Sequence, residues 1–429
     1  MARLPVKSTM IVNLLIFLIG LLVYGSYGLS GLAVLGGCTL VSYGAARLTE
    51  RLRWAMWISV GANVLMLLFF RAQKLVGLSF AAPLGVSYFA LMLISYNVDV
   101  YRGKYPAERN LYRFASYVTY YPHLLMGPIE GYDRLAPNLF ENRRMSLGGI
   151  SAGALRFVWG LFKRLVIAAR AGVIISAISA DPETYRGGFA LIAMLLYSVQ
   201  LYCDFSGGMD MVLGGSEMLG IRLSENFDAP YLSESFQEFW RRWHMTLGAW
   251  LRNYVYIPLG GNRKGKLRKN INLVLTFLVS GLWHGSAYVL WGLFNGLFVC
   301  VGSRMKTRSP FVNRLGTCFL VSLLWCFYVW PDTVLALKML ASAFTVFNYS
   351  QVAAAIGTLG LALSDWIVMG IALVVMGILD AKRATLLTGY RRLAPAVQTA
   401  LICLLTLIVL VFGMYGIGFN AGEFIYSQF

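Results

Sequence analysis

The stretch FLVSGLWHGSAYVLWG, residues 277–292, is apolar, aromatic or small at almost every position and lies within a longer apolar run, 271–302. About 20 consecutive apolar residues are enough for a helix to cross a bilayer. The run is therefore predicted to be helical and to lie in a membrane. One residue departs from the pattern: His284, although the whole chain has only three histidines. An ionisable group within a membrane span is costly and is a candidate for function.

Composition extends this interpretation to the whole chain. Of its 429 residues 58% are hydrophobic and 13% charged, whereas soluble domains carry about 25% charged residues. We therefore predict an all-α, polytopic integral membrane protein with about eleven transmembrane helices, forming a single domain over residues 1–429. The first run follows Arg3 and Lys7, which imitates a secretory signal, but we interpret it as a retained helix. The candidate spans are 10–27, 29–46, 54–70, 75–94, 150–180, 188–213, 271–302, 311–330, 333–347, 362–379 and 397–417.

The chain is strongly basic, with 37 Lys and Arg against 19 Asp and Glu and a net charge of +18. In a soluble protein this balance would suggest nucleic acid. Here the basic residues lie in short loops between the spans, as in 47–53 and 263–269. Such loops are typical of cytoplasmic topology signals, and they attract anionic lipids. The predicted partners therefore include membrane lipids and exclude nucleic acid.

The sequence offers no pattern for a metal or a tightly bound cofactor. Its six cysteines lie in apolar segments without metal-ligand spacing, which is typical of small side chains packed between helices. We find no Walker loop, no GxGxxG after a strand, no HExxH and no GxSxG. We predict neither a bound metal nor a resident cofactor.

Two stretches interrupt the apolar pattern. SESFQEFWRRWHMTLGAWLR, residues 233–252, has a capped helix start followed by aromatic residues at helical spacing, which predicts a helix at the membrane interface. YYPHLLMGPIEGYDRLAPNL, residues 120–139, holds prolines and glycines that would break a spanning helix. Broken backbone at membrane depth is tolerated only beside protein or a cavity. This second stretch is expected to form a re-entrant or interfacial turn that helps to line a cavity.

The histidines are the first candidates for chemistry. Histidine transfers protons near neutral pH, and burial would keep His284 neutral as a base; the alternative is a residue that packs between helices. His244 is either an interfacial residue or a second polar group in the same cavity. His123 is interpreted as structural.

Charged residues are given mainly structural interpretations. Asp204 and Asp210 lie in an apolar run and should have a partner or a cavity. The basic loop 263–269 is a topology signal that could also bind a phosphate-rich acyl donor or an acidic carrier protein.

Several of these segments together resemble one family. FWRRWHMTLGAWLRNYVYIPLGGNRKG (239–265), followed by NLVLTFLVSGLWHG (272–285), resembles the membrane-bound O-acyltransferase family. The similarity is to its bacterial branch of alginate O-acetyltransferases and teichoic acid D-alanyl transferases. YYPHLLMGPI, LYCDFSGGMDMVLG and the chain end FIYSQF also resemble segments of that branch. The resemblance covers about residues 120–296 and the terminus, and it places the catalytic core at about 115–300.

The resemblance implies a funnel-shaped helical protein with a thin central partition. His284, in the WHG motif, would be the catalytic residue, and His244, in the WRRWH motif, its partner. The acyl group would pass from a cytoplasmic thioester, either acetyl-CoA or an acyl carrier protein, to a hydroxyl on the far side. His284 would then abstract the hydroxyl proton, and His244 would hold the thioester or stabilise the oxyanion; an acyl-enzyme intermediate stays open. Six further residues in the resembling segments are predicted to bind substrate: Trp283, Asn262, Arg263, Tyr256, Trp240 and Pro128.

The sequence leaves four functions open. The first is acetyl transfer, in the bacterial inner membrane, to an exported polysaccharide or to a periplasmic acyltransferase partner. The second is D-alanyl transfer from a carrier protein to teichoic acid. The third is acyl transfer to a lipid or a protein. The fourth, from a different class, is a transporter or flippase that uses His284 in a proton relay; such proteins often contain internal repeats, and we find none in the sequence.

Overall fold

The computed structural model describes residues 6–73, 77–78, 80–141, 145–302 and 307–415. Throughout these ranges the regular structure is helical, with no strand, which confirms the all-α prediction. The chain divides into two compact units, one of Met1–Ala154 with Val212–Ser224 and the other of Leu155–Met211 with Glu225–Phe429. The single domain over 1–429 stays a prediction.

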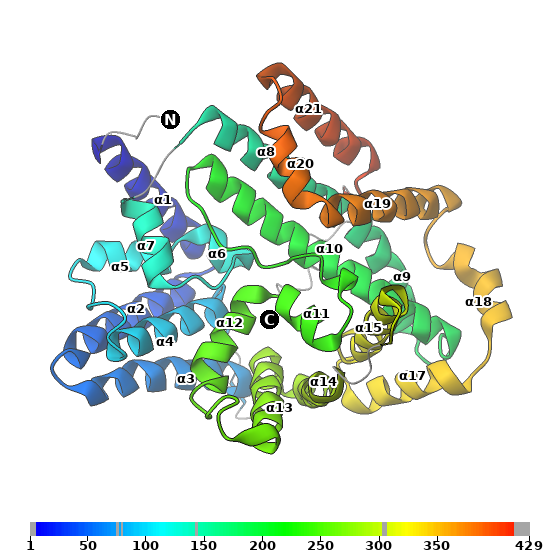
Figure 1. Ribbon diagram of the computed structural model, residues 1–429, viewed down its shortest axis with the longest axis horizontal. Helices are drawn as coiled ribbons and strands as arrows, with labels where there is room; N and C mark the ends of the chain where they lie inside the picture. Colours follow the sequence, from blue (N-terminus) through cyan, green and yellow to red (C-terminus); the bar gives the residue numbers. More distant parts are fainter. Residues whose placement is uncertain (1–5, 74–76, 79, 142–144, 303–306, 416–429) are drawn as a thin grey trace. The chain divides into compact units, whose positions relative to one another are not determined.

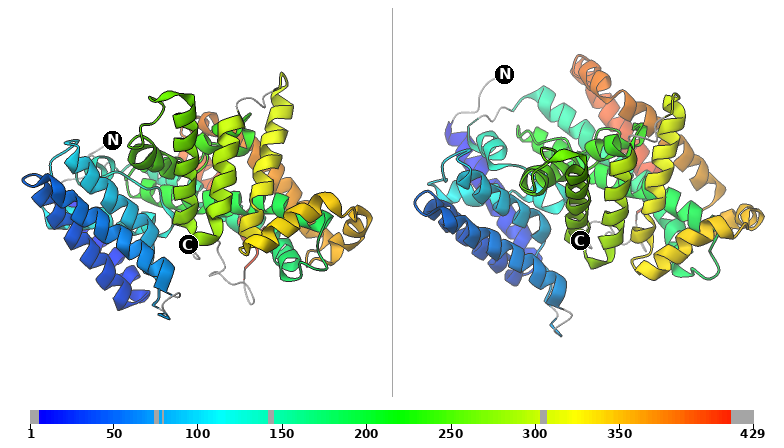
Figure 2. Two further views of the ribbon diagram at one scale, coloured as in Figure 1. Left: turned by 90° about the horizontal axis from the view of Figure 1, so that it is seen from below. Right: turned by 60° about the horizontal axis from the view of Figure 1, so that its bottom comes forward.

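The first unit is formed mainly by helices from the first third of the chain. Figures 1 and 2 show α2, α3 and α4 side by side, and these three pack on one another. The bounds of its helices are α1 Val6–Ser26, α2 Leu29–Thr49, α3 Met56–Ala72, α4 Val86–Tyr101, α5 Leu111–Val118, α6 Tyr121–Met126 and α7 Tyr132–Phe140.

The irregular stretch 120–139 belongs to this unit. It forms two short helices, α6 and α7, joined by a buried, non-helical segment around Pro128. Tyr117 Oη donates a hydrogen bond of 2.9 Å to the carbonyl of Glu130, and the Glu130 carboxylate accepts from both the backbone N–H and the hydroxyl of Ser224. These bonds satisfy backbone and side-chain groups that the break would otherwise leave buried and unpaired.

The second unit holds most of the longest helix, α10, and every cavity discussed below. Two helices, α8 and α10, run from one unit into the other. The bounds are α8 Leu147–Phe162, α9 Ala169–Ala180, α10 Gly188–Met218, α11 Phe236–Arg242, α12 Met245–Leu251, α13 Gly265–His284, α14 Val289–Val301, α15 Pro310–Leu324, α16 Cys326–Val329, α17 Thr333–Thr345, α18 Tyr349–Ala355, α19 Leu363–Ala381, α20 Arg383–Tyr390 and α21 Pro395–Phe412. Two π-helical segments, η3 Lys163–Ala168 and η5 Arg252–Tyr256, follow α8 and α12.

Within the described ranges, six helices are long and apolar enough to cross a membrane. Three shorter apolar helices accompany them: Met10–Ser26, Ser286–Val301 and Thr333–Thr345. The sequence predicted about eleven spans, because apolar runs do not show where a helix breaks. The run 271–302 divides at Gly285, where φ is 142°, and within the described part of the run 75–94 the α-helix begins at Val86.

The buried acidic residues of α10 have ion-pair partners. Asp204 pairs with Arg164 at 2.9 Å. Asp210 contacts Lys163 at 3.0 Å, Arg156 at 2.9 Å and Arg383 at 3.1 Å. Because a buried charge needs such compensation, these contacts agree with the structural interpretation of both aspartates.

Candidate active site

His284 is positioned by the close packing of α13 against α14. A Cβ added at Gly281 would lie 2.5 Å from the carbonyl oxygen of Tyr288, and one added at Gly292 would lie 2.4 Å from that of Phe277. Only glycine fits at such a crossing. His284 is the last residue of α13 and is 8% exposed. The carboxyl end of a helix carries partial negative charge, which stabilises a cation formed there.

His244 occupies an abrupt turn between α11 and α12. Its φ of 46° is left-handed, and His244 and Ala229 are the only non-glycine residues with positive φ in the described ranges. This conformation is uncommon for a non-glycine residue and, where it persists, is imposed by its surroundings. The sequence predicted one interfacial helix here. Its capped start is confirmed, since Ser235 accepts from the N–H of Glu238 at 3.2 Å, but the turn at His244 divides it in two.

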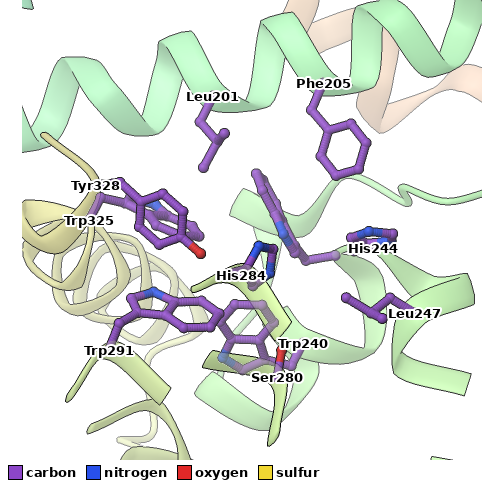
Figure 3. A pocket seen from close by; sticks show the side chains of 11 residues that line it. Leu201, Phe205, Trp240, His244, Leu247, Ser280, His284, Trp291, Trp325 and Tyr328 are labelled. Atoms are coloured by element: carbon purple, nitrogen blue, oxygen red, sulfur yellow. The ribbon is translucent and has the colours of Figure 1, made fainter. Parts of the chain in front are cut away.

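The two histidines line one small cavity of about 40 Å³ (Figure 3). A single water needs about 10–15 Å³, so this cavity has room for only a few atoms. Burial lowers the pKa of His244 well below its ordinary value, and the nearby His284 lowers it further. The other lining residues are Leu201, Phe205, Trp240, Trp243, Leu247, Ser280, Trp291, Trp325 and Tyr328.

Aromatic rings surround His284 closely. The ring centroids of Trp291 and Tyr328 lie 5.6 and 6.0 Å from that of the imidazole, both edge to face. Trp291 also stacks on Trp325, with centroids 6.0 Å apart. These walls are rigid and largely apolar, so charge interactions inside the cavity are stronger than in bulk water.

A second cavity, of about 360 Å³, adjoins the first. His244, Trp240 and Ser280 are among the residues that line both cavities. The wall of the larger cavity carries three cations, Arg241, Arg252 and Lys269, and none of the described residues lining it is a carboxylate. This charge distribution favours an anionic ligand.

The structure brings together only some of the predicted substrate-binding residues. Trp240 and Tyr256 line the larger cavity. Trp283 does not line either cavity, but its ring packs edge to face on His284, with centroids 4.7 Å apart. Asn262 and Arg263 are exposed in the turn before α13 and line neither cavity.

Two further predicted positions lie elsewhere. Pro128 is buried in the first unit and lines neither of these two cavities. The side chain of His123 lies outside the described residues.

Several lining residues were missed by the sequence analysis. Leu201, Trp325 and Tyr328 lie in runs that read simply as apolar, and periodicity does not tell which side chain faces a cavity. Asn226, which contacts His244, had no distinguishing motif of its own. The left-handed turn that brings Asn226 and His244 together is a tertiary feature.

Comparison with known proteins identifies the class to which this helical fold and its paired histidines belong. The sequence model of the membrane-bound O-acyltransferase family matches residues 91–330, more than half of the chain. The chain therefore belongs to the membrane-bound O-acyltransferase family and is a multi-pass membrane protein, which confirms the resemblance found in the sequence.

Several proteins of known name are similar in sequence to this chain. A probable alginate O-acetylase AlgI of Pseudomonas syringae pv. tomato is 42% identical over 272 residues, which are 61% of this chain and 52% of the relative. Its counterpart in Pseudomonas fluorescens is 37% identical over 356 residues, 79% of this chain and 71% of the relative. A peptidoglycan O-acetyltransferase of Helicobacter pylori is 29% identical over 390 residues, 78% of this chain and 74% of the relative. The matches thus span from about half to about three quarters of these relatives.

Proposed function

We propose that this protein is an O-acyltransferase that carries an acetyl group from a cytoplasmic thioester to a hydroxyl of an exported polysaccharide. The observation that supports this most strongly is the meeting of His244 and His284 in one small aromatic cavity, beside a larger cavity with a cationic wall. The names of the relatives, alginate O-acetylase and peptidoglycan O-acetyltransferase, also describe O-acetylation. We assign the protein to the inner membrane and its acceptor, a polysaccharide or an acyltransferase partner, to the outer side.

The proposed reaction needs one base at the narrow point. His284 takes the proton of the acceptor hydroxyl while that oxygen attacks the thioester carbonyl. The tetrahedral intermediate then collapses, the carbon–sulfur bond breaks, and the departing thiolate takes the proton back from His284. A positioned base of this kind contributes about 10²–10⁴-fold to the rate, and holding both substrates in one dry site contributes further.

Cavity size favours a small acyl group. The space of about 40 Å³ beside His284 has room for only a few waters, at about 10–15 Å³ each, which favours an acetyl group over a fatty acyl chain. The larger cavity, about 360 Å³, would take the pantetheine arm of the donor. Arg241, Arg252 and Lys269 would then attract its phosphate groups, since phosphate binds strongly to such side chains.

The proposal is tested with purified protein in proteoliposomes that are supplied with radiolabelled acetyl-CoA and an alginate oligosaccharide. The expected result is labelled O-acetyl ester on the oligosaccharide, and little ester with His284→Ala at the same amount of folded protein. Ester formed only from a D-alanyl carrier protein would replace acetyl transfer by D-alanyl transfer. Label or polymer that crosses the membrane without any covalent product would overturn the enzymatic proposal in favour of a transporter.

A further inference from the structure

The side-chain oxygen of Asn226 collects three contacts from the turn that contains His244. The Thr246 backbone N–H donates to Asn226 Oδ1 at 3.0 Å, and the Thr246 hydroxyl donates to it at 2.9 Å. His244 Nδ1 lies 3.2 Å from the same oxygen. The backbone carbonyl of Asn226 also accepts from the Met245 N–H at 2.9 Å. Asn226, fully buried at 0% exposure, therefore contacts three consecutive residues, 244–246.

These contacts determine which way the amide of Asn226 points. An amide can be reversed in a structure without changing its shape, so its orientation has to follow from its partners. A backbone N–H is always a donor, and at 3.0 Å it must face the oxygen and not the NH₂ group. The oxygen at this position is consequently fixed by Thr246, independently of any assumption about His244.

The tautomer of His244 follows from that oxygen. An amide oxygen only accepts, so the ring nitrogen beside it, Nδ1, carries the proton. In a neutral imidazole the other nitrogen, Nε2, is then the acceptor. His244 Nε2 is buried and has no hydrogen-bond partner among the residues that the structure describes.

We propose that Asn226 is a positioning residue that holds His244, which lines the cavity shared with His284, in the Nδ1-protonated tautomer and so leaves a free lone pair on Nε2. His244 then binds a hydrogen-bond donor of the substrate, an O–H or an amide N–H, and is not an oxyanion donor while neutral. This revises the sequence-based expectation that it stabilises an oxyanion. The role in substrate binding depends on the proposed function, whereas the tautomer does not.

The backbone supports the same inference. His244 has a left-handed φ of 46°, a conformation that costs free energy in a residue with a side chain and persists only when its surroundings impose it. The bonds from Met245 and Thr246 to Asn226 impose it here. Asn226 thus determines both the direction of the ring and the nitrogen that it presents.

Nitrogen-15 NMR of histidine-labelled protein in lipid bilayers tests the tautomer directly. The chain has only three histidines, so His244→Gln and His284→Gln assign the signals. We expect His244 to show a protonated Nδ1 and an unprotonated Nε2. A wild-type spectrum with the proton on Nε2 would overturn the proposal, even if the enzyme transfers acyl groups as proposed.

Substitutions at Asn226 and Thr246 distinguish a role in positioning His244 from a role in the stability of the fold. Asn226→Ala removes the acceptor, and the His244 signals should change to the other tautomer or to a mixture. Asn226→Asp keeps an acceptor oxygen and should retain the Nδ1 proton, as should Thr246→Val, which keeps the backbone donor. Unchanged His244 signals in a folded Asn226→Ala protein would contradict the assignment. If that variant does not fold, the proposal stands or falls on the wild-type, Asn226→Asp and Thr246→Val spectra.

Acyl-transfer activity provides a second, independent test of the role of Asn226. Asn226→Ala should lower kcat by about tenfold or more, and Asn226→Asp should recover part of it at high pH. A structural role alone would lower the amount of folded protein without this recovery. If no acyl transfer is found in any variant, the proposed function fails and the tautomer assignment is still decided by NMR.

Discussion

The glycine crossing between α13 and α14 allows a quantitative prediction for Gly292→Ala. The added Cβ would lie 2.4 Å from the carbonyl oxygen of Phe277, while ordinary contacts begin at 3.4 Å. The obstacle is backbone, which cannot rotate away like a side chain. The two helices must therefore separate locally by about 1 Å, and His284, at the end of α13, must move relative to His244.

A displacement of this size has predictable consequences. A 1 Å misplacement of reacting groups can cost about 10²-fold in rate, so we expect kcat to fall by about that factor. Overpacking in a well-packed region costs about 1–3 kcal/mol of stability. The variant should therefore remain folded at low temperature while losing most of its activity.

The assay is acetyl transfer at saturating donor and acceptor, normalised to folded protein measured by size-exclusion chromatography. Gly316→Ala is the matched control, because it adds the same methyl group to α15, where nothing lies within 4 Å. It should keep wild-type activity. A Gly292→Ala protein with wild-type kcat would refute the reasoning that this crossing sets the position of His284.

Three other perturbations have defined outcomes. Leu201→Ala widens the small cavity and should raise the ratio of propionyl to acetyl transfer rates about tenfold, since one methylene in an apolar pocket is worth about 1–3 kcal/mol. The control is Leu213→Ala, because Leu213 is equally buried on α10, and this variant should leave the ratio unchanged. An unchanged ratio in Leu201→Ala would contradict the proposed acyl site. Lys269→Gln should raise KM for acetyl-CoA about two- to fivefold, the range of an exposed ion pair, and the difference from the wild type should shrink in high salt. A variant with the wild-type KM would exclude contact between Lys269 and the donor phosphate. Asn226→Asp places a carboxylate beside His244, which raises the pKa of the imidazole. Because the neutral ring is required, the acidic limb of the pH profile of kcat should move to higher pH than in the wild type. An acidic limb that does not move would show that protonation of His244 does not cause it.

Sequence alone predicted the helical class well, because hydrophobicity over long runs is a direct consequence of the membrane environment. It did not predict where the apolar runs divide into separate helices. The apolar run 271–302 reads as one segment, yet Gly285 divides it and makes His284 the end of a helix. Glycine is compatible with both a continuous helix and a break, so only the packing of α13 on α14 decides between them.

The residues of the candidate site were only partly predictable from the sequence. His284 and His244 are chemically conspicuous in their surroundings, and the resemblance linked them across forty positions. Leu201, on α10, and Trp325, between α15 and α16, contribute walls from segments far away in the chain. Nothing in an apolar run distinguishes a lining residue from one that faces lipid. Asn226 acts through a left-handed turn that no local pattern specifies.

In the proposed reaction His284 is the base that activates the acceptor hydroxyl. The most direct measurement is the single-turnover rate of acetyl transfer from acetyl-CoA to an alginate oligosaccharide, with saturating donor, for wild type and His284→Ala. We expect a rate at least about 10²-fold lower in the variant, with acetyl-CoA still bound at nearly the wild-type Kd. Transfer at the wild-type rate by a folded His284→Ala protein would contradict it.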